Sequence, residues 1–471
     1  MNRSIIFRQH DYDALQNHLF ADTTREQGAI LLAATGTTSS ALRIMVHDVL
    51  PLVAADYLVH ESDRLVIAPD TLARAMKRAG RAHLSLVLVH THPGAEDRVD
   101  FSEVDDEGEE RLFRVVDHRL PYAPHASMVF GWNIAAGRVW EQGSASSIDR
   151  IIVVGESLRF ITDRTGGLLR DGERNEERYD RQVRAFGASG QSALMSLRVG
   201  VVGCGGTGSA VVEQLVRLGV GHIVVIDPDV MEESNLTRVY GSSQDDVVKG
   251  RHKVELAARL AASLGHDQTV IPIAGDVRDE ETARCLLDVD VIFGCTDSHW
   301  SRLVLNRLGF QYLIPLIDLG VRIDARGGKL HGVVGRVSTI QPGSPCLFCT
   351  GVINDRTIVA ESLPADDLHK QVHEGYIQGV EEHAPSVISL NTVMAGAAVT
   401  ECLCMIAGWR TNSGTQGHQY TYNVLNGTMR VASFDGDPTC WCRGPAGCGD
   451  ATALPYRPSP RPNGPSVAME R

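Results

Sequence analysis

Two histidines close an apolar run in the first third of the chain and could bind a metal ion. His90 and His92 follow the run Leu84–Val89, and because strand side chains alternate between faces, both imidazoles point to the same side. Asp105 opens a predicted helix nearby and offers a carboxylate as a third ligand. Two histidines and one carboxylate, with the fourth position left for water, are typical of a catalytic zinc site.

Glu26 precedes a second apolar run, Gly28–Leu32, and could act as the general base on that water. A simpler interpretation of these residues stays open. His-x-His pairs are common, Glu26 could be a solvated residue at a strand edge, and Ser102 with Asp105 forms a capping box that satisfies helix N-terminal amides without any chemistry. Their order, on a predicted strand and at a helix start, favours the metal site.

A glycine-rich turn lies near the middle of the chain. The predicted strand Leu197–Val202 runs into Gly203-Cys204-Gly205-Gly206-Thr207-Gly208, and an apolar helix follows. Glycines in this context let backbone amides approach a phosphate at the helix N-terminus. Asp227 ends the next strand and can hold ribose hydroxyls. These features fit a dinucleotide as well as ATP.

The charged residues that follow discriminate between these two ligands. Asp229, Asn235 and Arg238 lie close together in the sequence, and Lys253 and Asp297 come later. Attack of a carboxylate on the α-phosphate of ATP needs cations around the reacting centre, whereas hydride transfer needs little such help. Arg238 and Lys253 can supply the cations, and Asp297 can carry magnesium. Taken singly, the two cations could be surface charges and Asp297 a helix cap.

Two separated groups of cysteines predict a structural zinc site. Cys346 and Cys349 form a C-x-x-C pair, and Cys440 and Cys442 form a C-x-C pair with Cys448 close behind. Four thiolates that join distant segments are typical of a tetrahedral zinc site. The spacing leaves open whether Cys442 or Cys448 is the fourth ligand, and free buried thiols are the alternative.

The segment from residue 350 to 400 contains no cysteine. A ubiquitin-type activating enzyme needs a nucleophilic cysteine for thioester transfer, and this is its natural place. The other cysteines, Cys204, Cys285, Cys295, Cys402 and Cys404, are expected to be small core hydrophobes. The sequence therefore supports adenylation and does not support a thioester.

The composition is that of a globular protein: of 471 residues, 43% are hydrophobic and 22% charged. The formal charge of −13 argues against nucleic-acid binding that depends on the overall charge of the protein. Charged residues interrupt the start of the chain, and the longest weakly polar run, Met394–Trp409, is shorter than a membrane span. We therefore expect a cytoplasmic protein without nucleic-acid or membrane partners.

The elements that carry these groups divide the chain into four parts. Residues 1–145 alternate short strands and helices, and 146–177 read as a polar, glycine- and arginine-rich linker. Residues 178–449 follow a strand–helix–strand pattern that predicts a parallel α/β sheet. Residues 450–471 are rich in proline and are predicted to be disordered.

The first set of residues resembles the JAMM (MPN-type) metallopeptidases, whose pattern is a glutamate, then His-x-His-Pro, then Ser-x-x-Asp. By this resemblance His90, His92 and Asp105 would ligate the catalytic zinc, Glu26 would shuttle protons, and Ser102 would stabilise the oxyanion. Such enzymes cut peptide or isopeptide bonds after the C-terminal glycine of ubiquitin-like proteins. The gap between the second histidine and the serine is two residues longer than is usual in that family.

The second set resembles the ubiquitin-activating-enzyme-like adenylyltransferases, the ThiF/MoeB/HesA family, from about Arg178 to Gly449. The shared features are Arg178-Tyr179-Asp180-Arg181-Gln182, the glycine turn, Asp-x-Asp, Ser-Asn-Leu-x-Arg, the later lysine and Cys-Thr-Asp. The resemblance implies a homodimer in which Arg181 reaches the partner's ATP site. Val239 departs from the glutamine usual in the family. The residues implied to bind ATP and magnesium are Gly203, Gly205, Gly206, Gly208, Asp227, Asp229, Asn235, Arg238, Lys253 and Asp297.

The sequence thus predicts an α/β protein with an N-terminal JAMM-type metallopeptidase domain and a Rossmann-like, doubly wound adenylation domain with a structural zinc site. The hypothesis is ATP-dependent adenylation of the C-terminal glycine of a ubiquitin-like protein, coupled to zinc-dependent maturation or deconjugation of the same protein. A separate transferase could supply the missing cysteine. The alternatives are adenylation of a sulfur-carrier protein or small peptide with the N-terminal domain as a docking module, and, third, a dinucleotide-dependent dehydrogenase.

Overall fold

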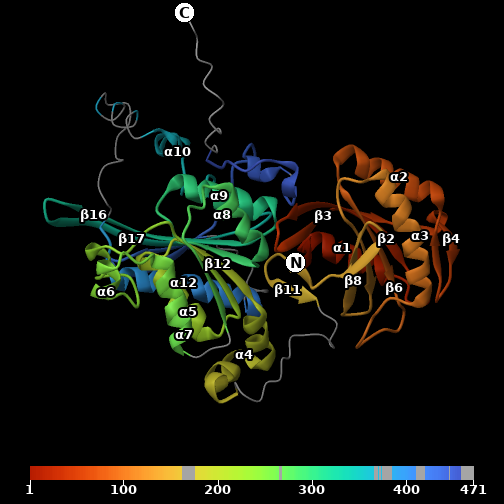
Figure 1. Cartoon of the computed structure of the whole chain (residues 1–471), viewed down its shortest axis with the longest axis horizontal. Helices are drawn as coiled ribbons and strands as arrows, with labels where there is room; N and C mark the ends of the chain where they lie inside the picture. The colour runs from red at the N-terminus through yellow and green to blue at the C-terminus, as the bar shows by residue number, and fades with distance from the viewer. Residues whose placement is uncertain are drawn as a thin grey trace, which may run out of the picture.

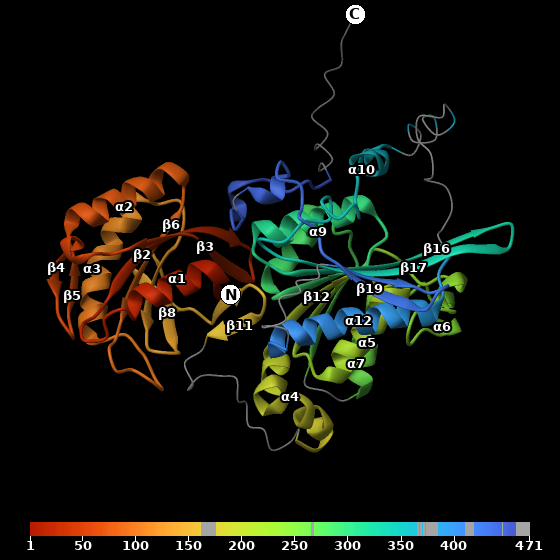
Figure 2. The same cartoon turned by 180° about the vertical axis from the view of Figure 1, so that it is seen from behind.

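A computed structural model describes residues 1–161, 176–264, 268–364, 367, 370, 373, 385–409, 419–444 and 446–457. These residues form two α/β bodies side by side, with the N-terminal body on the right in Figure 1 and the second body on the left (Figure 1). The same arrangement is seen from behind in Figure 2. Each body is built on its own large sheet.

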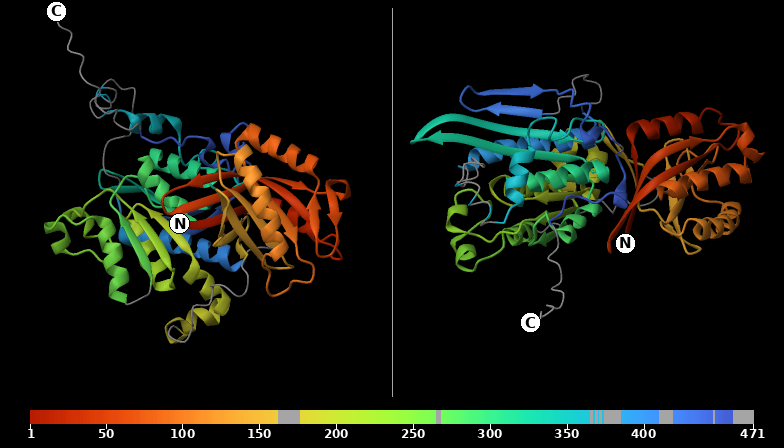
Figure 3. Two further views of the ribbon diagram at one scale, coloured as in Figure 1. Left: turned by 45° about the vertical axis from the view of Figure 1, so that its right-hand side comes forward. Right: turned by 90° about the horizontal axis from the view of Figure 1, so that it is seen from above.

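The N-terminal body is a nine-stranded mixed sheet flanked by helices (Figure 3). Continuous apolar runs such as Ala29–Ala34 are fully buried because helices cover both faces of this sheet. Its strands, in spatial order, are β11 (Leu158–Ile161), β10 (Arg150–Val154), β1 (Asn2–Arg8), β3 (Ala41–Pro51), β2 (Gly28–Thr37), β6 (Ser85–Thr91), β7 (His125–Phe130), β8 (Ala135–Glu141) and β9 (Ser144–Ser147). The remaining elements are α1 (Gln9–Leu19), α2 (Pro69–Ala82), α3 (Glu103–Arg119) and the small hairpin of β4 (Tyr57–His60) and β5 (Leu65–Ile67).

The second body is an eight-stranded sheet whose first five strands are parallel. Its strands, in spatial order, are β14 (Thr269–Ile273), β13 (His222–Ile226), β12 (Arg198–Val202), β15 (Val291–Gly294), β16 (Leu316–Arg326), β17 (Lys329–Ile340), β18 (Gln419–Asn423) and β19 (Thr428–Ala432). The chain reverses its direction of crossover between β12 and β15, and a ligand binds at such a switch point in open α/β sheets. The predicted Rossmann-like sheet is therefore present.

Helices cover this second sheet, and the longest apolar one, α12, packs against α5 and against β16 and β17. α12 is long and apolar enough to cross a membrane, but its buried side chains, among them Met394 and Val399, lie in the core of the body. The helices are α4 (Glu176–Ser196, with a kink at Phe186 and Gly187), α5 (Gly206–Leu218), α6 (Gln244–Val248), α7 (Lys253–Leu264), α8 (Glu280–Arg284), α9 (His299–Gln311), α10 (Asp355–Ser362) and α12 (Ile388–Ala407).

The domain boundaries differ from those expected. The first sheet continues past residue 145, because β10 pairs with β1 in parallel and β11 pairs with β10. The N-terminal body therefore extends to Ile161, and most of the described part of the expected linker belongs to it. Residues 450–457, expected to be disordered, are also ordered: Leu454 is buried, and the amide of Arg457 donates to the carbonyl oxygen of Arg278 at 2.7 Å. Residues 162–175 and 458–471 lie outside the described residues.

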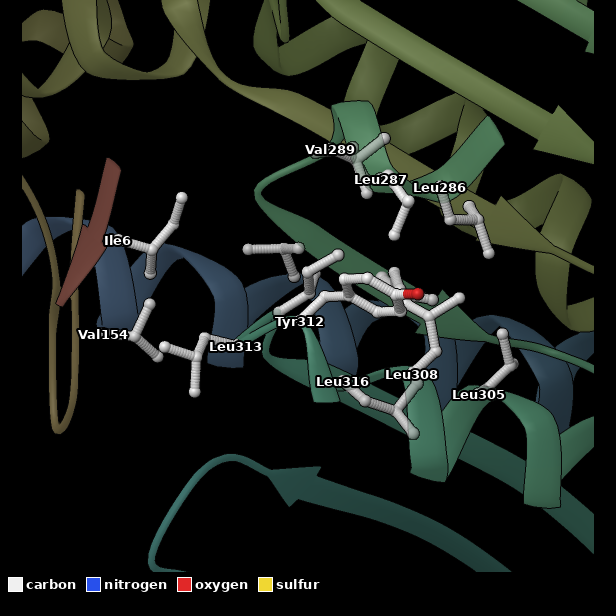
Figure 4. Close-up of a cluster of buried hydrophobic side chains, with 14 of the residues drawn as sticks. Ile6, Val154, Leu286, Leu287, Val289, Leu305, Leu308, Tyr312, Leu313 and Leu316 are labelled. Carbon is white, nitrogen blue, oxygen red and sulfur yellow. The ribbon is translucent and has the colours of Figure 1, made fainter. Parts of the chain in front are cut away.

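The two bodies share a buried interface. Figure 4 shows Ile6 and Val154 of the first body beside Leu313 of the second, and these side chains belong to one apolar cluster (Figure 4). The guanidinium of Arg43, only 2% exposed, donates hydrogen bonds across the interface to three carbonyl oxygens, those of Tyr312 (2.7 Å), Val289 (3.1 Å) and Leu313 (3.2 Å). Burial lowers the pKa of this guanidinium to about 10.

A segment near the C-terminal end of the described chain completes this interface. Asp450 accepts hydrogen bonds from the amide of Thr37 (3.1 Å), the hydroxyl of Tyr312 (2.6 Å) and the guanidinium of Arg284 (3.0 Å). Gly449 lies so close to the carbonyl oxygen of Thr35 that an added Cβ would approach it to 2.3 Å. Residues from three distant parts of the sequence thus hold the two bodies together as one unit.

The interface lies at one end of each sheet. β2 runs from Gly28, which pairs with His90, to Thr37 at the interface, a length of roughly 25–30 Å. In the second body, Val289 and Tyr312 precede β15 and β16, so the interface is at the amino ends of the parallel strands. The carboxyl ends of these strands, where the glycine turn lies, therefore face away from the N-terminal body.

Candidate active sites

The two histidines and the aspartate predicted to bind zinc meet in the N-terminal body. The Nε2 atoms of His90 and His92 are 3.2 Å apart. The carboxylate of Asp105 places one oxygen 3.2 Å from Nε2 of His90 and the other 3.4 Å from Nε2 of His92. His90 lies at the end of β6, where it pairs with Gly28, and Asp105 lies in the first turn of α3. The structure thus brings the three predicted side chains together in one group.

These distances fit a zinc ion. With metal–ligand bonds of about 2.0–2.1 Å, tetrahedral geometry puts ligand atoms about 3.3–3.4 Å apart. Although burial raises the pKa of Asp105, hydrogen bonds from His90 and His92 hold it well below its usual range, so the carboxylate is ionised. The donor set and its spacing therefore suit the predicted ion.

Glu26 lies just before β2, where its backbone amide donates to the carbonyl oxygen of Glu61 at 2.9 Å. The residue is only 7% exposed, and burial raises the pKa of its carboxyl group, while the charges of His90 and His92 act in the opposite direction. The structure thus places Glu26 beside the two histidines, with a pKa moved toward the range that suits a general base.

Ser102 takes part in the expected capping box. Its hydroxyl accepts from the amide of Asp105 at 3.2 Å and donates to the carboxylate of Asp105 at 2.7 Å. The capping and metal-binding interpretations are therefore compatible, because the cap orients the carboxylate that faces the histidines.

Two residues that support this site were not singled out from the sequence. The guanidinium of Arg138 lies 3.9 Å from the ring centre of Phe101, and this ring contacts His90. Arg138 also pairs with Glu109 at 2.8 Å. The arginine is on β8, far from the histidines in the sequence, so no local pattern indicates this role.

The glycine turn connects β12 to α5 as predicted. Gly203 has a φ of 92°, and an added Cβ would lie 2.6 Å from the carbonyl oxygen of Cys295. Gly208 packs against Gly203 so closely that its Cβ would lie 1.8 Å from that residue's carbonyl oxygen. Gly205, by contrast, has open space on its Cβ side. The turn is thus packed tightly at both ends and open at the helix N-terminus, where an anion binds.

The two aspartates after β13 have different positions. Asp227 is buried, and its carboxylate accepts hydrogen bonds from the amides of Cys204 (2.6 Å) and Asp229 (2.9 Å), so it holds the glycine turn. Asp229 is exposed and pairs with Nζ of Lys253 at 2.7 Å. Asp229 is therefore the carboxylate that is accessible to a ribose, and Lys253 lies next to it.

Arg238 also lies at the glycine turn. Its Cδ atom is 3.4 Å from the point that a Cβ on Gly206 would occupy, and its guanidinium donates to the carbonyl oxygen of Ser234 at 2.6 Å. The loop is shaped by Asn235, which is buried and accepts from the amide of Glu232 at 3.1 Å. Val239, where the resemblance expects glutamine, is buried in a small apolar cluster.

Asp297 follows β15, beside the glycine turn, because the amide of Cys295 donates to the carbonyl oxygen of Val202 at 2.8 Å. Its side chain is exposed. The N-cap residue of α9 is Ser298, so Asp297 does not cap this helix. Glu361 of α10, also missed from the sequence, supports this turn: its carboxylate accepts from the hydroxyl of Ser298 at 2.6 Å and from two backbone amides.

The predicted structural zinc site is gathered at the edge of the second body. The Sγ atoms of Cys346 and Cys349 are 3.8 Å apart, those of Cys346 and Cys440 3.6 Å, and those of Cys349 and Cys442 3.7 Å. Tetrahedral zinc–sulfur bonds of about 2.3 Å require about 3.8 Å between sulfurs. Cys442 is thus the fourth member of the cluster, and Cys448 lies outside it.

Of the cysteines outside the cluster, Cys204 and Cys402 are buried, whereas Cys285, Cys295, Cys404 and Cys448 are half-buried. Burial raises the pKa values of Cys204 and Cys402 to about 12 and raises that of Cys295 as well. Such thiols stay protonated and unreactive at neutral pH. Arg181 is exposed on α4.

Comparisons with known proteins bear on the second body. The profile of the ThiF family matches residues 179–442, more than half of the chain. A SAMP-activating enzyme E1 of Haloferax volcanii is 34% identical over 175 residues, which are 37% of this chain and 61% of that enzyme. The sulfur carrier protein ThiS adenylyltransferase of Bacillus subtilis is 34% identical over 36% of this chain and 49% of its own.

The molybdopterin-synthase adenylyltransferase of Escherichia coli is 33% identical over 36% of this chain and 66% of its own. The chain therefore spans between about half and two thirds of the length of these curated relatives. Among solved structures, E. coli MccB with ATP covers 58% of this chain and 76% of its own, with 22% identity and a TM-score of 0.45.

Proposed function

The chain belongs to the ThiF family, and from this premise we propose that it converts the C-terminal carboxylate of a small ubiquitin-like or sulfur-carrier protein into an acyl-adenylate, using ATP and magnesium. The observation that carries the proposal is the gathering of Arg238, Lys253, Asp229 and Asp297 around the open helix N-terminus at Gly205. The names of the relatives, a SAMP-activating enzyme, an adenylyltransferase of the sulfur carrier protein ThiS and a molybdopterin-synthase adenylyltransferase, support the class of substrate. The family match also favours ATP over the dinucleotide of a dehydrogenase.

In the proposed reaction, a carboxylate oxygen of the substrate's last glycine attacks the α-phosphorus of ATP. A bond from that oxygen to phosphorus forms, and the bond to the bridging oxygen of the pyrophosphate breaks. Arg238 and Lys253 neutralise the charge that develops on the α-phosphate and on the leaving pyrophosphate. The amides of the glycine turn bind the phosphates, Asp229 orients the ribose, and Asp297 is placed to hold magnesium, which supplies further positive charge.

For the N-terminal body, we propose hydrolysis of the bond that follows the same terminal glycine, either in a precursor or in a conjugate. The support is the ligand geometry of His90, His92 and Asp105. A zinc ion bound there would activate water as a nucleophile. Glu26 would accept the water's proton and pass it to the leaving amine, and Ser102 would hold Asp105 and stabilise the oxyanion. The alternative is that this body only docks the substrate protein.

The product of the proposed adenylation is passed on without a thioester on this chain, because residues 350–400 contain no cysteine and burial raises the pKa values of Cys204, Cys295 and Cys402. A sulfur donor or a separate cysteine transferase would take the acyl group. A homodimer with Arg181 at the partner's nucleotide site, and a cytoplasmic location that keeps the ten cysteines reduced, are part of the same proposal.

ATP–pyrophosphate exchange tests the adenylation proposal. The protein should exchange labelled pyrophosphate into ATP only when magnesium and a candidate ubiquitin-like protein that ends in glycine are present. The matched control is the same protein with its terminal carboxylate converted to an amide, which cannot attack phosphorus. Exchange that is equal with both forms, or absent with every free-carboxylate protein or peptide offered, would contradict the proposal.

A further inference from the structure

Asn391 lies against the glycine turn although it is nearly two hundred residues away in the sequence. It belongs to the first turn of α12, is 3% exposed, and comes from a helix that packs along α5. A Cβ added to Gly206 would lie 2.2 Å from Nδ2 of Asn391 and 3.4 Å from Cδ of Arg238. The amide of Asn391 and the aliphatic part of the Arg238 side chain thus both pack against the Cα atom of Gly206.

The side chain of Asn391 has hydrogen-bonding capacity to spare. Its NH₂ group carries two donors, and within the described residues the side chain makes one hydrogen bond, from Nδ2 to the hydroxyl of Ser386 at 3.0 Å. A buried amide with a free donor is costly unless a ligand or water satisfies it. The nearest place where such a ligand is expected is the anion site at the N-terminus of α5.

The next residue joins α12 to the second wall of the same site. The hydroxyl groups of Thr392 and Tyr240 are 2.7 Å apart, and the amide of Tyr240 donates to the hydroxyl of Ser209 in the first turn of α5 at 3.1 Å. Tyr240 follows Arg238 by two residues, so the start of α12 holds both the loop that carries Arg238 and the helix that follows the glycines.

We infer that Asn391 is a nucleotide-positioning residue, which sets Gly206 and Arg238 against the phosphate chain of ATP and directs its free N–H toward the phosphates. This inference rests on one part of the proposed function, which is that the site binds ATP. It also explains why position 206 must be glycine: any side chain there would displace the amide.

Direct binding of nucleotide tests this inference without any protein substrate. Calorimetry would measure the affinities of magnesium-ATP and of adenosine for the wild type and for Asn391→Leu and Asn391→Asp. Loss of a hydrogen bond to a charged group should weaken ATP binding about tenfold or more. The aspartate variant should be weaker still, because it places a carboxylate beside phosphates. Adenosine affinity should not change.

Thr400→Val is the matched control, because it removes an exposed hydroxyl of the same helix, which donates to the carbonyl oxygen of Gly396 at 2.8 Å, and it should keep the wild-type preference for ATP over adenosine. The thermal midpoint of each unliganded variant would be measured alongside. Two results would overturn the inference: ATP binding in both Asn391 variants equal to that of the wild type, or equal losses for ATP and adenosine. Failure of the wild type to bind ATP would instead refute the proposed function, and this inference with it.

Discussion

The guanidinium of Arg43 donates to the carbonyl oxygen of Tyr312 across the interface of the two bodies, at 2.7 Å. These residues belong to different sheets, and the two further carbonyl oxygens on the same guanidinium also lie in the second body. Among the described residues, all the hydrogen bonds of this buried guanidinium go to the other body, so it links the stabilities of the two bodies. The N-terminal body and the ThiF body should therefore unfold together.

Replacing Arg43 with methionine tests this link. The change leaves three buried carbonyl oxygens without a donor, so we expect a loss of roughly 2–4 kcal/mol in the free energy of unfolding. Calorimetry should show the single wild-type transition shifted to lower temperature or split in two. Arg74→Met, which removes an exposed pair with Asp56, should cost less than about 1 kcal/mol. Equal effects of the two changes would contradict a linking role.

The tetracysteine site should stabilise the same interface. Cys442 comes shortly before the segment that carries Asp450, whose carboxylate holds the amide of Thr37. Cys442→Ser should remove one equivalent of zinc and speed hydrogen exchange at Thr37. Cys448→Ser, a change six residues away, should keep both the zinc and the slow exchange. Zinc loss in the Cys448 variant would show that the cluster is assigned wrongly.

The sequence predicts the elements of both bodies well, because each depends on local patterns: an apolar run, a capping serine, a glycine turn. His90 lies near the end of β6 and His92 directly after it, and the glycines of the turn follow β12 at the expected spacing. What the sequence could not indicate depends on contacts between distant segments. Arg138, Glu361 and Asn391 reach their sites through tertiary packing, which no local spacing records.

The ends of the two bodies likewise depend on contacts between distant segments. β10 is a short apolar run in an otherwise polar stretch, and it becomes a strand of the first sheet only by pairing with β1, at the opposite end of that domain's sequence. The segment after residue 449 is similar: Asp450 is ordered by Arg284 and Tyr312, not by its neighbours in the chain.

The metal content should distinguish an active N-terminal body from a docking module. We expect two zinc ions per chain in the wild type and one in His92→Ala, which keeps the tetracysteine ion. The same variant should lose hydrolysis of a ubiquitin-like precursor while its ATP–pyrophosphate exchange with the mature protein stays unchanged. His83→Ala, a change at the end of α2, is the control and should keep both ions. A wild type with one zinc ion would favour the docking module.

The positions of the two sites predict that they act in separate encounters. Both lie at the ends of their sheets that face away from the shared interface, so a substrate tail cut at one site cannot reach the other without dissociating. In a mixture of His92→Ala and Asp297→Ala proteins, one variant has only the adenylation site and the other only the hydrolytic site. With each working site at the same concentration as in the wild type, the mixture should therefore form adenylate from the precursor as fast as the wild type. Direct transfer between the sites would be indicated by two results together. The mixture would form adenylate more slowly than the wild type, and excess unlabelled mature protein would not reduce the adenylate that the wild type forms from labelled precursor.

The central claim is that cations gathered at the glycine turn stabilise adenylate formation, and charge removal at two lysines four residues apart tests it most directly. Lys253→Met removes the cation beside Asp229, whereas Lys249→Met removes an exposed cation that pairs with Asp245. In ATP–pyrophosphate exchange with a glycine-terminated ubiquitin-like protein, we predict that Lys253→Met loses about 100-fold or more in rate and that Lys249→Met keeps the wild-type rate. Equal rates in the two variants would contradict the claim.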